Sequence, residues 1–587
     1  MVRRRSDRDR SVLRAVLRVF VFSWLSFVGS AAAQVPEKSC DQYLLAPRQV
    51  KGKPVGPKSC LMQETSGTHE GRALTRIDIG LDGTVDGYLA KVGDYKEYFS
   101  NSPELVFPQT WGAREIFFGV AAYERDKGAS MTIVFPTSPS AWNGKIWVTA
   151  HGRGTSFKQG QLKVWNRYAD PTNVVAGLDR YDLLIVSKGY AFVKTRRTST
   201  EGLGEIKAVL EDGTVVDYVA FNDTAKYIMD FADVAKEVVA ERLGRDPTRT
   251  YFYGHSAGAR IGHDLNYSSG LNVGRDGKPF FDGILADDPA AGTWYPVVMK
   301  DGTDVLFATD AEKAAFVPQI DVAHQNYNNI WEPNHPAWMS NSYLENKRNN
   351  ARILRDKHMA NYRMYEVRGV SHAGGETLTT SNAELPERSE TVGEPSRSAA
   401  GSARSGSTVI VRRAIQNLDL AKAMDRFIDM IDAWADKGIA PPPTHSDWAE
   451  LGDADRDGEI EYPALAFPEI ACPLGVYFSY PESTSGTTSF AAFTGEGIEP
   501  LDGRKAFVDM NRNGVWDYRE TATQAWRRLG LLKKNEELTR EKYVACVQNA
   551  AEKLRREGFF SDKTAGAYVE QAKTTELQPR QRSASGR

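Results

Sequence analysis

The sequence has few cysteines, no long apolar run and no excess of basic charge. Four of its 587 residues are cysteine, so the fold must rest on a hydrophobic core rather than on a dense disulfide framework. Its 74 basic and 76 acidic residues nearly balance, which excludes the positive field that attracts nucleic acid. No apolar stretch reaches the roughly 20 residues that span a bilayer. The chain is expected to be globular, and its 41% hydrophobic content can bury a sizeable core.

Residues 1–33 differ from the rest of the chain. An arginine-rich start is followed by the apolar run VFVFSWLSFVG and by the small residues SAAA. This pattern predicts a signal peptide cleaved after Ala33; the alternative, a single membrane anchor, is disfavoured by the short run. Cleavage removes seven arginines and two aspartates, which changes the formal net charge from −2 to −7. We expect a secreted or periplasmic protein with no membrane span and no nucleic-acid partner.

The cysteines of an exported chain meet an oxidising compartment, where they form disulfides. The four are Cys40, Cys60, Cys472 and Cys546, and three pairings are possible. We favour Cys40 with Cys60, which closes a short loop, and Cys472 with Cys546.

Strand patterns divide the chain into a β-rich opening and a longer α/β region. Between about Ala73 and Pro136, β-rich runs alternate with glycine and charged turns, as in antiparallel strands. Farther on, short apolar runs are separated by helix-like stretches, which is typical of a mostly parallel sheet. One of these stretches begins at Asn222 or Asp223 and predicts a helix lying on the sheet. Its apolar face is expected to hold Ile228, Phe231, Ala235, Val238, Val239 and Leu243.

The expected units are a signal peptide (1–33), a β-rich segment (34–120), a central α/β domain (121–440), a C-terminal extension (441–574) and a disordered tail (575–587). Within the α/β domain, residues 381–407 are rich in Ser, Glu, Gly and Pro and predict a disordered insertion. The stretch APPPTHS, from Ala440, predicts a linker to the C-terminal extension.

The pentad Gly254-His255-Ser256-Ala257-Gly258 places a serine between two glycines. A chain with 50 glycines can contain such a pentad by chance, so its context decides. The apolar TYFY precedes it and the helix-like AGARIGHDLNY follows, which indicates a strand-to-helix turn. Glycines permit a strained backbone there, and the helix start supplies positive charge. We predict that Ser256 is a nucleophile.

Two other segments supply partners for this serine. The strand KIWVTAH precedes a loop in which the N–H of Gly152 or Arg153, with that of Ala257, predicts an oxyanion hole; an ordinary glycine turn is the alternative. The last strand, YRMYEV, is followed by His372 and then by a long amphipathic stretch, which is the position of a general base. The histidines interpreted as structural or surface residues are His263, His324 and His335.

Several residues are candidates for the acid that orients His372. The acid usually follows the strand before the histidine strand, and here Asp321 lies within that strand, VPQIDVAH. Glu332 is the only later carboxylate in the region and is the first choice. The alternatives are Asp287 and Asp288, after FFDGILA, and Asn329, which would orient the ring without charge.

These motifs resemble those of the alpha/beta-hydrolases, and more narrowly those of exported bacterial proteins described only as alpha/beta-hydrolase-domain proteins. The stretches that carry the resemblance, from about Ala141 to Ala572, are WNGKIWVTAHG, YGHSAGARIGHDL, FFDGILA, YRMYEVRGVSHAGG and TREKYVACVQNAAEKLRREGFFSDKTAGAYVEQA. The resemblance implies an α/β fold with a mostly parallel sheet flanked by helices, and a serine hydrolase. The chain departs from the group near Gln325 to Asn329, where an acid is expected, and after Ser381, where it has the insertion.

The favoured activity is hydrolysis of a small-molecule or polymeric carboxylic ester through an acyl-enzyme. The same parts would serve for lactones, polyesters or amides. The rival interpretation is a non-catalytic binding or surface protein on a hydrolase scaffold.

The stretch DMNRNGVWDYRE, near the end of the chain, has the spacing of a calcium loop. The expected ligands are Asp509, Asn511, Asn513, the Val515 carbonyl, Asp517 and Glu520, with glycine at the sixth place for the sharp turn. A solvated acidic turn is the alternative. An earlier stretch, from Asp453 to Gly458, begins in the same way but has Ala464 at the twelfth place, so it is a weaker site or a turn.

Overall fold

The structure is a computed structural model of the whole chain. It describes residues 38–44, 46, 48–50, 53–55, 59–82, 88–92, 114–118, 131–151, 173–195, 204–209, 215–220, 222–255, 257–267, 272–274, 276–288, 299–300, 303–304, 316–324, 360–368, 370, 418, 420–443, 465–478, 497–500 and 520–577. The predicted signal peptide, the insertion at 381–407 and the acidic stretch at 453–458 lie outside these residues.

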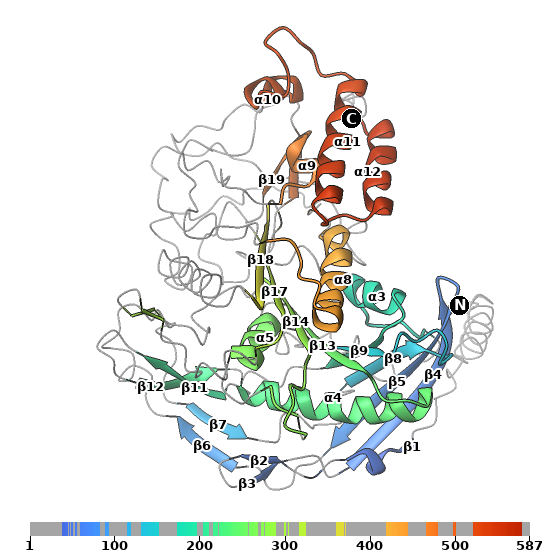
Figure 1. Ribbon diagram of the computed structural model, residues 1–587, viewed down its shortest axis with the longest axis vertical. Coiled ribbons are helices and arrows are strands. Elements are labelled where there is room, and N and C mark those ends of the chain that lie inside the picture. The colour runs from blue at the N-terminus through green and yellow to red at the C-terminus, as the bar shows by residue number, and fades with distance from the viewer. Residues whose placement is uncertain are drawn as a thin grey trace, which may run out of the picture.

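A ten-stranded sheet forms the centre of the molecule, in the order β1-β4-β5-β8-β10-β9-β13-β14-β17-β18 (Figure 1). Its antiparallel part consists of β1 (Lys38–Ser39), β4 (Ser59–His69), β5 (Arg72–Asp82) and β8 (Met131–Pro136), and β8 pairs antiparallel with β10 (Ala191–Thr195). The parallel part continues from β10 through β9 (Lys145–His151), β13 (Arg249–His255), β14 (Gly283–Asp287), β17 (Gln319–His324) and β18 (Tyr362–Val367). The predicted antiparallel opening and parallel continuation are confirmed.

Five two-stranded sheets accompany it in the described parts of the chain. They pair β2 (Arg48–Val50) with β3 (Lys53–Val55), β6 (Tyr88–Val92) with β7 (Arg114–Phe118), β11 (Gly204–Val209) with β12 (Val215–Ala220), β15 (Met299–Lys300) with β16 (Thr303–Asp304), and β19 (Gly475–Phe478) with β20 (Gly497–Pro500).

Strands β4 and β5 form a long hairpin near one edge of the large sheet. Its two turn residues, Glu70 and Gly71, both have positive φ, at 47° and 78°, which matches the right-handed twist of the flanking strands. At the other end of the hairpin, Cys60 forms a disulfide with Cys40, which follows β1 and begins the short 3-10 helix η1 (Asp41–Tyr43). This pairing confirms the first predicted disulfide.

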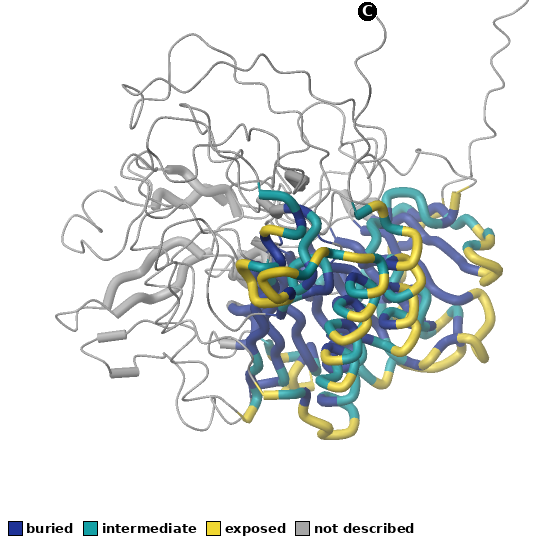
Figure 2. Tube along the Cα trace, turned by 90° about the horizontal axis from the view of Figure 1, so that it is seen from above, coloured by how far each residue is buried: buried dark blue, intermediate teal, exposed yellow. Residues whose placement is uncertain are grey.

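Helices cover both faces of the sheet (Figure 1). One face packs against α4 (Asn222–Leu243) and α5 (Ala257–Tyr267), and the other against α3 (Arg180–Ser187) and α8 (Ala421–Lys437). Neighbouring residues of one strand therefore enter different cores, as Phe252 and Tyr253 do on β13. The six apolar residues predicted for α4 are all buried, which confirms that helix. Figure 2 shows the strands buried inside and the exposed residues along the outer helices and turns.

The acidic side of α8 fixes the amino ends of two parallel strands. Lys145, the first residue of β9, binds Asp432 at 2.6 Å and Asp436 at 3.0 Å. Arg249, the first residue of β13, lies 3.3 Å from Asp436, and the Tyr251 hydroxyl donates to Asp432. These contacts bind the C-terminal half of α8 to the edge of the sheet where the parallel strands begin.

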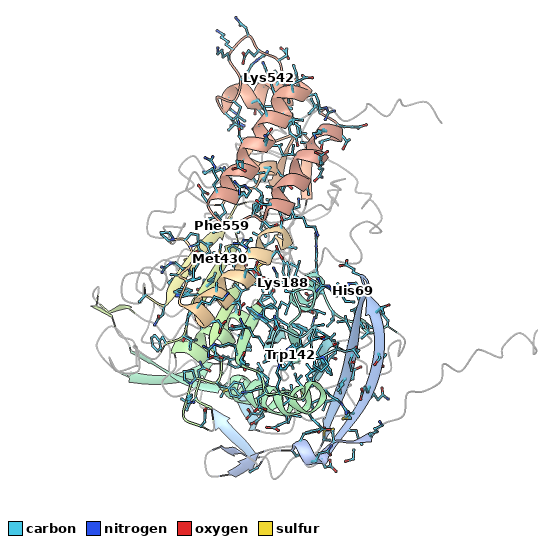
Figure 3. All side chains as sticks on the ribbon, turned by 45° about the vertical axis from the view of Figure 1, so that its right-hand side comes forward. His69, Trp142, Lys188, Met430, Lys542 and Phe559 are labelled. Carbon is cyan, nitrogen blue, oxygen red and sulfur yellow. A yellow bond between two sulfur atoms is a disulfide. The ribbon has the colours of Figure 1, made fainter. Side chains whose placement is uncertain are left out.

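The C-terminal helices are α9 (Pro468–Ala471), α10 (Ala522–Arg528), α11 (Arg540–Arg556) and α12 (Asp562–Thr574). Phe559, between α11 and α12, packs against Tyr365 of β18 and Phe427 of α8, so this part shares a core with the sheet. Figure 3 shows Met430 of α8 and Phe559 at this junction. The Cys472–Cys546 disulfide joins the end of α9 to α11 and confirms the second predicted pairing.

No helix in the described ranges is long and apolar enough to cross a membrane.

Candidate active site

The structure places the glycine pentad at a strand-to-helix turn. Strand β13 ends at His255 and α5 begins at Ala257, so a single residue, Ser256, separates them. Ser256 itself lies outside the described residues. A Cβ atom at Gly254 would lie 2.2 Å from the carbonyl oxygen of Gly258, a distance that only glycine avoids. The predicted context of the pentad is thereby confirmed, because the start of α5 packs directly on the end of β13.

The carboxyl ends of β9, β13, β14, β17 and β18 lie at one edge of the sheet, because these strands are parallel. The predicted site residues Gly152, Arg153, Ser256, Glu332 and His372 all follow one of these strand ends in the sequence. All five lie outside the described residues. The strand order is consistent with the expectation that these five residues meet at one edge of the sheet. Their individual roles stay predictions.

Ala257 is the first residue of α5. The first N–H groups of a helix have no partner within the helix, and they form its positive end. An N–H at this position suits the developing negative charge of an oxyanion, as the sequence analysis predicts for Ala257.

Three neighbouring parallel strands end in a histidine, an aspartate and a histidine. His255 ends β13, Asp287 ends β14 and His324 ends β17. The Nδ1 atom of His255 lies 3.0 Å from Asp287 Oδ2, and the Nε2 atom of His324 lies 2.7 Å from Asp287 Oδ1. The Tyr253 hydroxyl also donates to Oδ2, at 3.1 Å. One fully buried carboxylate thus accepts hydrogen bonds from three side chains.

The buried residues Asp287 and His324 shift each other's pKa. Burial alone would raise the pKa of Asp287, but the charge of His324 and the hydrogen bond and charge of His255 hold that pKa below its usual range. Burial alone would lower the pKa of His324, but the negative charges of Asp287 and Asp288 raise it. The arrangement favours an ionised Asp287 beside a protonated His324.

Asp288 continues from Asp287 with an unusual backbone. Its φ is 44°, in the left-handed region, and its N–H donates to the Val322 carbonyl at 2.7 Å. Its carboxylate lies 3.6 Å from His324 Nδ1 and accepts from the His324 backbone N–H at 3.3 Å. The residue is fully buried. A strained, buried carboxylate at the carboxyl edge of the sheet marks a position of functional interest.

From the sequence, Asp287 and Asp288 were expected only as partners for His372, and His324 was interpreted as a structural or surface residue. Among the described residues, the histidines that these carboxylates contact are His255 and His324. The sequence carried part of this signal, since His324 ends the predicted strand VPQIDVAH and Asp287 follows the apolar run FFDGILA, but it did not group these residues with His255.

His263 fits its predicted structural role. It lies on α5, is fully buried, and its Nε2 atom is 2.9 Å from Asp321 Oδ2. Asp321 lies inside β17, as predicted, and also accepts from the Tyr362 hydroxyl and the Gln319 amide. This pair lies on the face of the sheet that α4 and α5 cover.

Of the predicted calcium ligands, only Glu520 lies within the described residues. Its carboxylate accepts from Arg528 Nε at 3.0 Å and 3.2 Å, and it lies next to Thr521, the N-cap of α10. Within the described ranges, no group of three or more His, Cys, Asp or Glu side chains is arranged to hold a metal ion. An oxygen donor such as Glu520 is chemically suited to calcium, and Arg528 is a competing cation for it.

The sheet order, the strand directions and the glycine-flanked turn between β13 and α5 define an alpha/beta-hydrolase fold. The chain belongs to the alpha/beta hydrolase domain family, whose family model matches residues 143–570, more than half of its length. The match includes most of the predicted C-terminal extension. A comparison with curated proteins found no significant match.

Solved structures of hydrolases match this chain at low similarity. Esterase B from Lactobacillus rhamnosis is 15% identical, with 40% of this chain and 68% of that chain covered and a TM-score of 0.24. Carboxyl esterase 2 from Tuber melanosporum is 13% identical, with 48% and 76% covered and a TM-score of 0.23. The poly(3-hydroxybutyrate) depolymerase LpqC from Bordetella parapertussis is 16% identical, with 43% and 82% covered and a TM-score of 0.24. These values are too low to carry a substrate over to this chain.

Proposed function

We propose that this protein is an exported serine hydrolase that cleaves carboxylic esters. Membership of the alpha/beta hydrolase domain family supports hydrolysis as the general chemistry. The observation that carries the finer proposal is the contact between Gly254 and Gly258, which joins β13 to α5 with one residue, Ser256, between them. A serine at this turn is the nucleophile position of the fold.

In the proposed reaction, the Oγ atom of Ser256 attacks the ester carbonyl carbon while His372 takes its proton. The backbone N–H of Ala257 and that of Gly152 or Arg153 stabilise the oxyanion of the tetrahedral intermediate. His372 then gives the proton to the leaving alcohol, and an acyl-enzyme remains. Water, deprotonated by His372, releases the acid and restores Ser256.

For the acid that orients His372, we propose Glu332 as the first candidate, because it follows β17, the strand before the histidine strand. Asp288 is the alternative that the structure supports best, since it is buried and strained at the end of β14. Asp287 is less suited, because both of its oxygens already accept from histidines. Asn329, the uncharged candidate, lies outside the described residues.

Export to the periplasm or the medium is proposed from the predicted signal peptide, and the two disulfides are consistent with it. N-terminal sequencing of the protein recovered outside the cytoplasm tests this, with Gln34 as the expected first residue.

A structural calcium ion at Asp509, Asn511, Asn513, the Val515 carbonyl, Asp517 and Glu520 is proposed from the ligand spacing. It would tie down the C-terminal loop and take no part in the chemistry.

Labelling with an active-site-directed fluorophosphonate tests the proposed activity. We expect the folded protein to react at Ser256, and a Ser256→Ala variant to remain unlabelled. A panel of esters, lactones and amides then defines the substrate class. A folded protein that does not react with the probe would instead support a binding protein on a hydrolase scaffold.

A further inference from the structure

The residue before the proposed nucleophile is held by a buried cluster that the hydrolytic mechanism does not use. His255 is the last residue of β13, and its side chain is 4% exposed. Its Nδ1 atom lies 3.0 Å from Asp287 Oδ2, and an ionised carboxylate only accepts hydrogen bonds, so Nδ1 carries the proton. We call His255, Asp287 and His324 the strand-end cluster.

The strand-end cluster lies on the face of the sheet opposite to α5. Phe252 faces the core that contains α5, whereas Tyr253 faces the other core, and successive side chains of a strand alternate. His255 therefore points to the same side as Tyr253, whose hydroxyl donates to the same carboxylate. The turn that carries Ser256 is held on one face by the contact of Gly254 with Gly258 and on the other by His255.

We propose that His255 is a positioning residue for Ser256, and that Asp287 and His324 hold His255 in place. The proposal rests on the proposed function, since it assumes that Ser256 is the nucleophile. A hydrogen bond from the side chain to a fixed carboxylate restrains the backbone of His255, and the next peptide unit leads directly into Ser256. Nucleophilic attack requires this restraint, because a misplacement of about 1 Å lowers the rate about 100-fold.

His324 contributes by orienting the carboxylate. It binds Asp287 Oδ1 at 2.7 Å, which leaves Oδ2 for His255 and Tyr253. Because His324 is fully buried and lies between Asp287 and Asp288, its own orientation is also fixed.

Two pairs of variants separate positioning from general stability. Asparagine at position 255 places an amide N–H near the site of Nδ1, whereas glutamine places it near Nε2, so His255→Asn keeps the donor to Asp287 and His255→Gln moves it. His255→Leu and His263→Leu form the second pair, since each removes a buried histidine 3.0 Å or 2.9 Å from an aspartate oxygen. Only His255 adjoins Ser256.

The experiment measures kcat and KM for a reactive ester and the rate constant for fluorophosphonate labelling of Ser256, with thermal unfolding of every variant. We expect His255→Leu and His255→Gln to lower kcat and the labelling rate about 10- to 100-fold with little change in KM. His255→Asn should retain most of both rates. His263→Leu should lose thermal stability and keep its labelling rate.

The outcomes distinguish failure of the positioning role from failure of the proposed function. If all four variants are labelled at the wild-type rate, or if His263→Leu slows labelling as much as His255→Leu does, the positioning role is overturned while the proposed function stands. If the wild-type protein is not labelled, the proposed function and the positioning role both fail. Should the leucine variants not fold, equal rates for His255→Asn and His255→Gln still overturn the proposal.

Discussion

At the scale of single residues, Ser256 and His372 carry the proposed chemistry. Ser256→Ala and His372→Ala should each lower ester turnover by about 10⁴-fold or more, because the members of a catalytic triad act as a unit. Thermal unfolding of both variants should stay close to that of the wild type. Steady-state assays of purified protein measure the loss, and near-normal turnover by folded Ser256→Ala would rule out this mechanism.

The acid is tested by comparing two isosteric changes. If Glu332 orients His372, Glu332→Gln should lower kcat more than Asp288→Asn, because the amide cannot stabilise the imidazolium. The kcat values of the two variants with one ester give the ranking. The reverse ranking would assign the role to Asp288, the residue with the strained backbone at the end of β14.

The sequence predicted the strand before position 256 and the helix after it better than it predicted the side-chain contacts beside them. Glycine spacing and the switch from strand to helix pattern are local signals, and both were correct for the described residues around Ser256. The contacts of His255 and His324 with Asp287 were missed, because they depend on which strands are neighbours and on their register. A local sequence pattern contains no information on strand order or register.

At the scale of elements, the packing of α5 on β13 rests on the absence of a side chain at Gly254. Gly254→Ala should lower the free energy of unfolding by about 1–3 kcal/mol, because the new Cβ atom forces the helix start away from the strand. Urea unfolding measures this change. Gly566→Ala is the control: it lies in α12 with nothing within 4 Å of a built Cβ, so alanine there should be neutral or stabilising. Equal effects of the two changes would contradict the packing argument.

Asp287, at the end of β14, and His324, at the end of β17, should make the free energy of unfolding depend on pH. The lowered pKa of Asp287 adds stability that is present above the unfolded value, about 3.9, and is lost as pH falls through the folded value. The raised pKa of His324 adds stability that is present below the unfolded value, about 6.5, and is lost as pH rises through the folded value. Their joint contribution is therefore greatest between about pH 4 and 6.5.

Urea unfolding across pH 3 to 9 tests this expectation, with His324→Gln as the comparison. Among the described residues, the charged and titratable groups that face His324 include Asp287, Asp288 and His255. The wild type should lose stability above about pH 6.5 more steeply than the variant. Parallel pH profiles of the two proteins would show that the fold does not raise the pKa of His324.

Element prediction succeeded where apolar residues recur at a clear period and failed where they do not. The face of α4 and the parallel strands were predicted because their buried residues are apolar. Strand β4 was missed, since its second half, ETSGTH, is polar and becomes a strand through pairing with β5. The amphipathic stretch predicted after His372 contains α8, which starts at Ala421.

At the scale of the whole molecule, the C-terminal part shares a core with the sheet through Tyr365, Phe427 and Phe559. The sequence predicted a linker from Ala440 and a separate extension after it, because a proline-rich stretch can be recognised from the local sequence. The packing of aromatic rings from distant segments cannot be recognised in that way. A calcium ion in the predicted loop would therefore affect the stability of the whole molecule.

We expect a chelator to lower the melting temperature and millimolar calcium to restore it, because extracellular sites of this kind bind at about 10⁻⁴ to 10⁻³ M. Differential scanning calorimetry with both additions measures the shift. Glu520→Gln should abolish the response, and magnesium should replace calcium poorly. Arg528→Gln is the matched control: it frees Glu520 from its ion pair and should keep or strengthen the response. A melting curve indifferent to chelator and calcium would show that the loop is an acidic turn.

Capture of the acyl-enzyme would show whether Ser256 is the nucleophile. The protein is mixed with an ester whose acyl group is released slowly, quenched in acid within the first turnover, digested and analysed by mass spectrometry. We expect one acyl group on the peptide that contains Ser256, and none on that peptide from the Ser256→Ala variant. Ester turnover with no acyl group on Ser256, or with the group on another residue, would contradict the proposed mechanism.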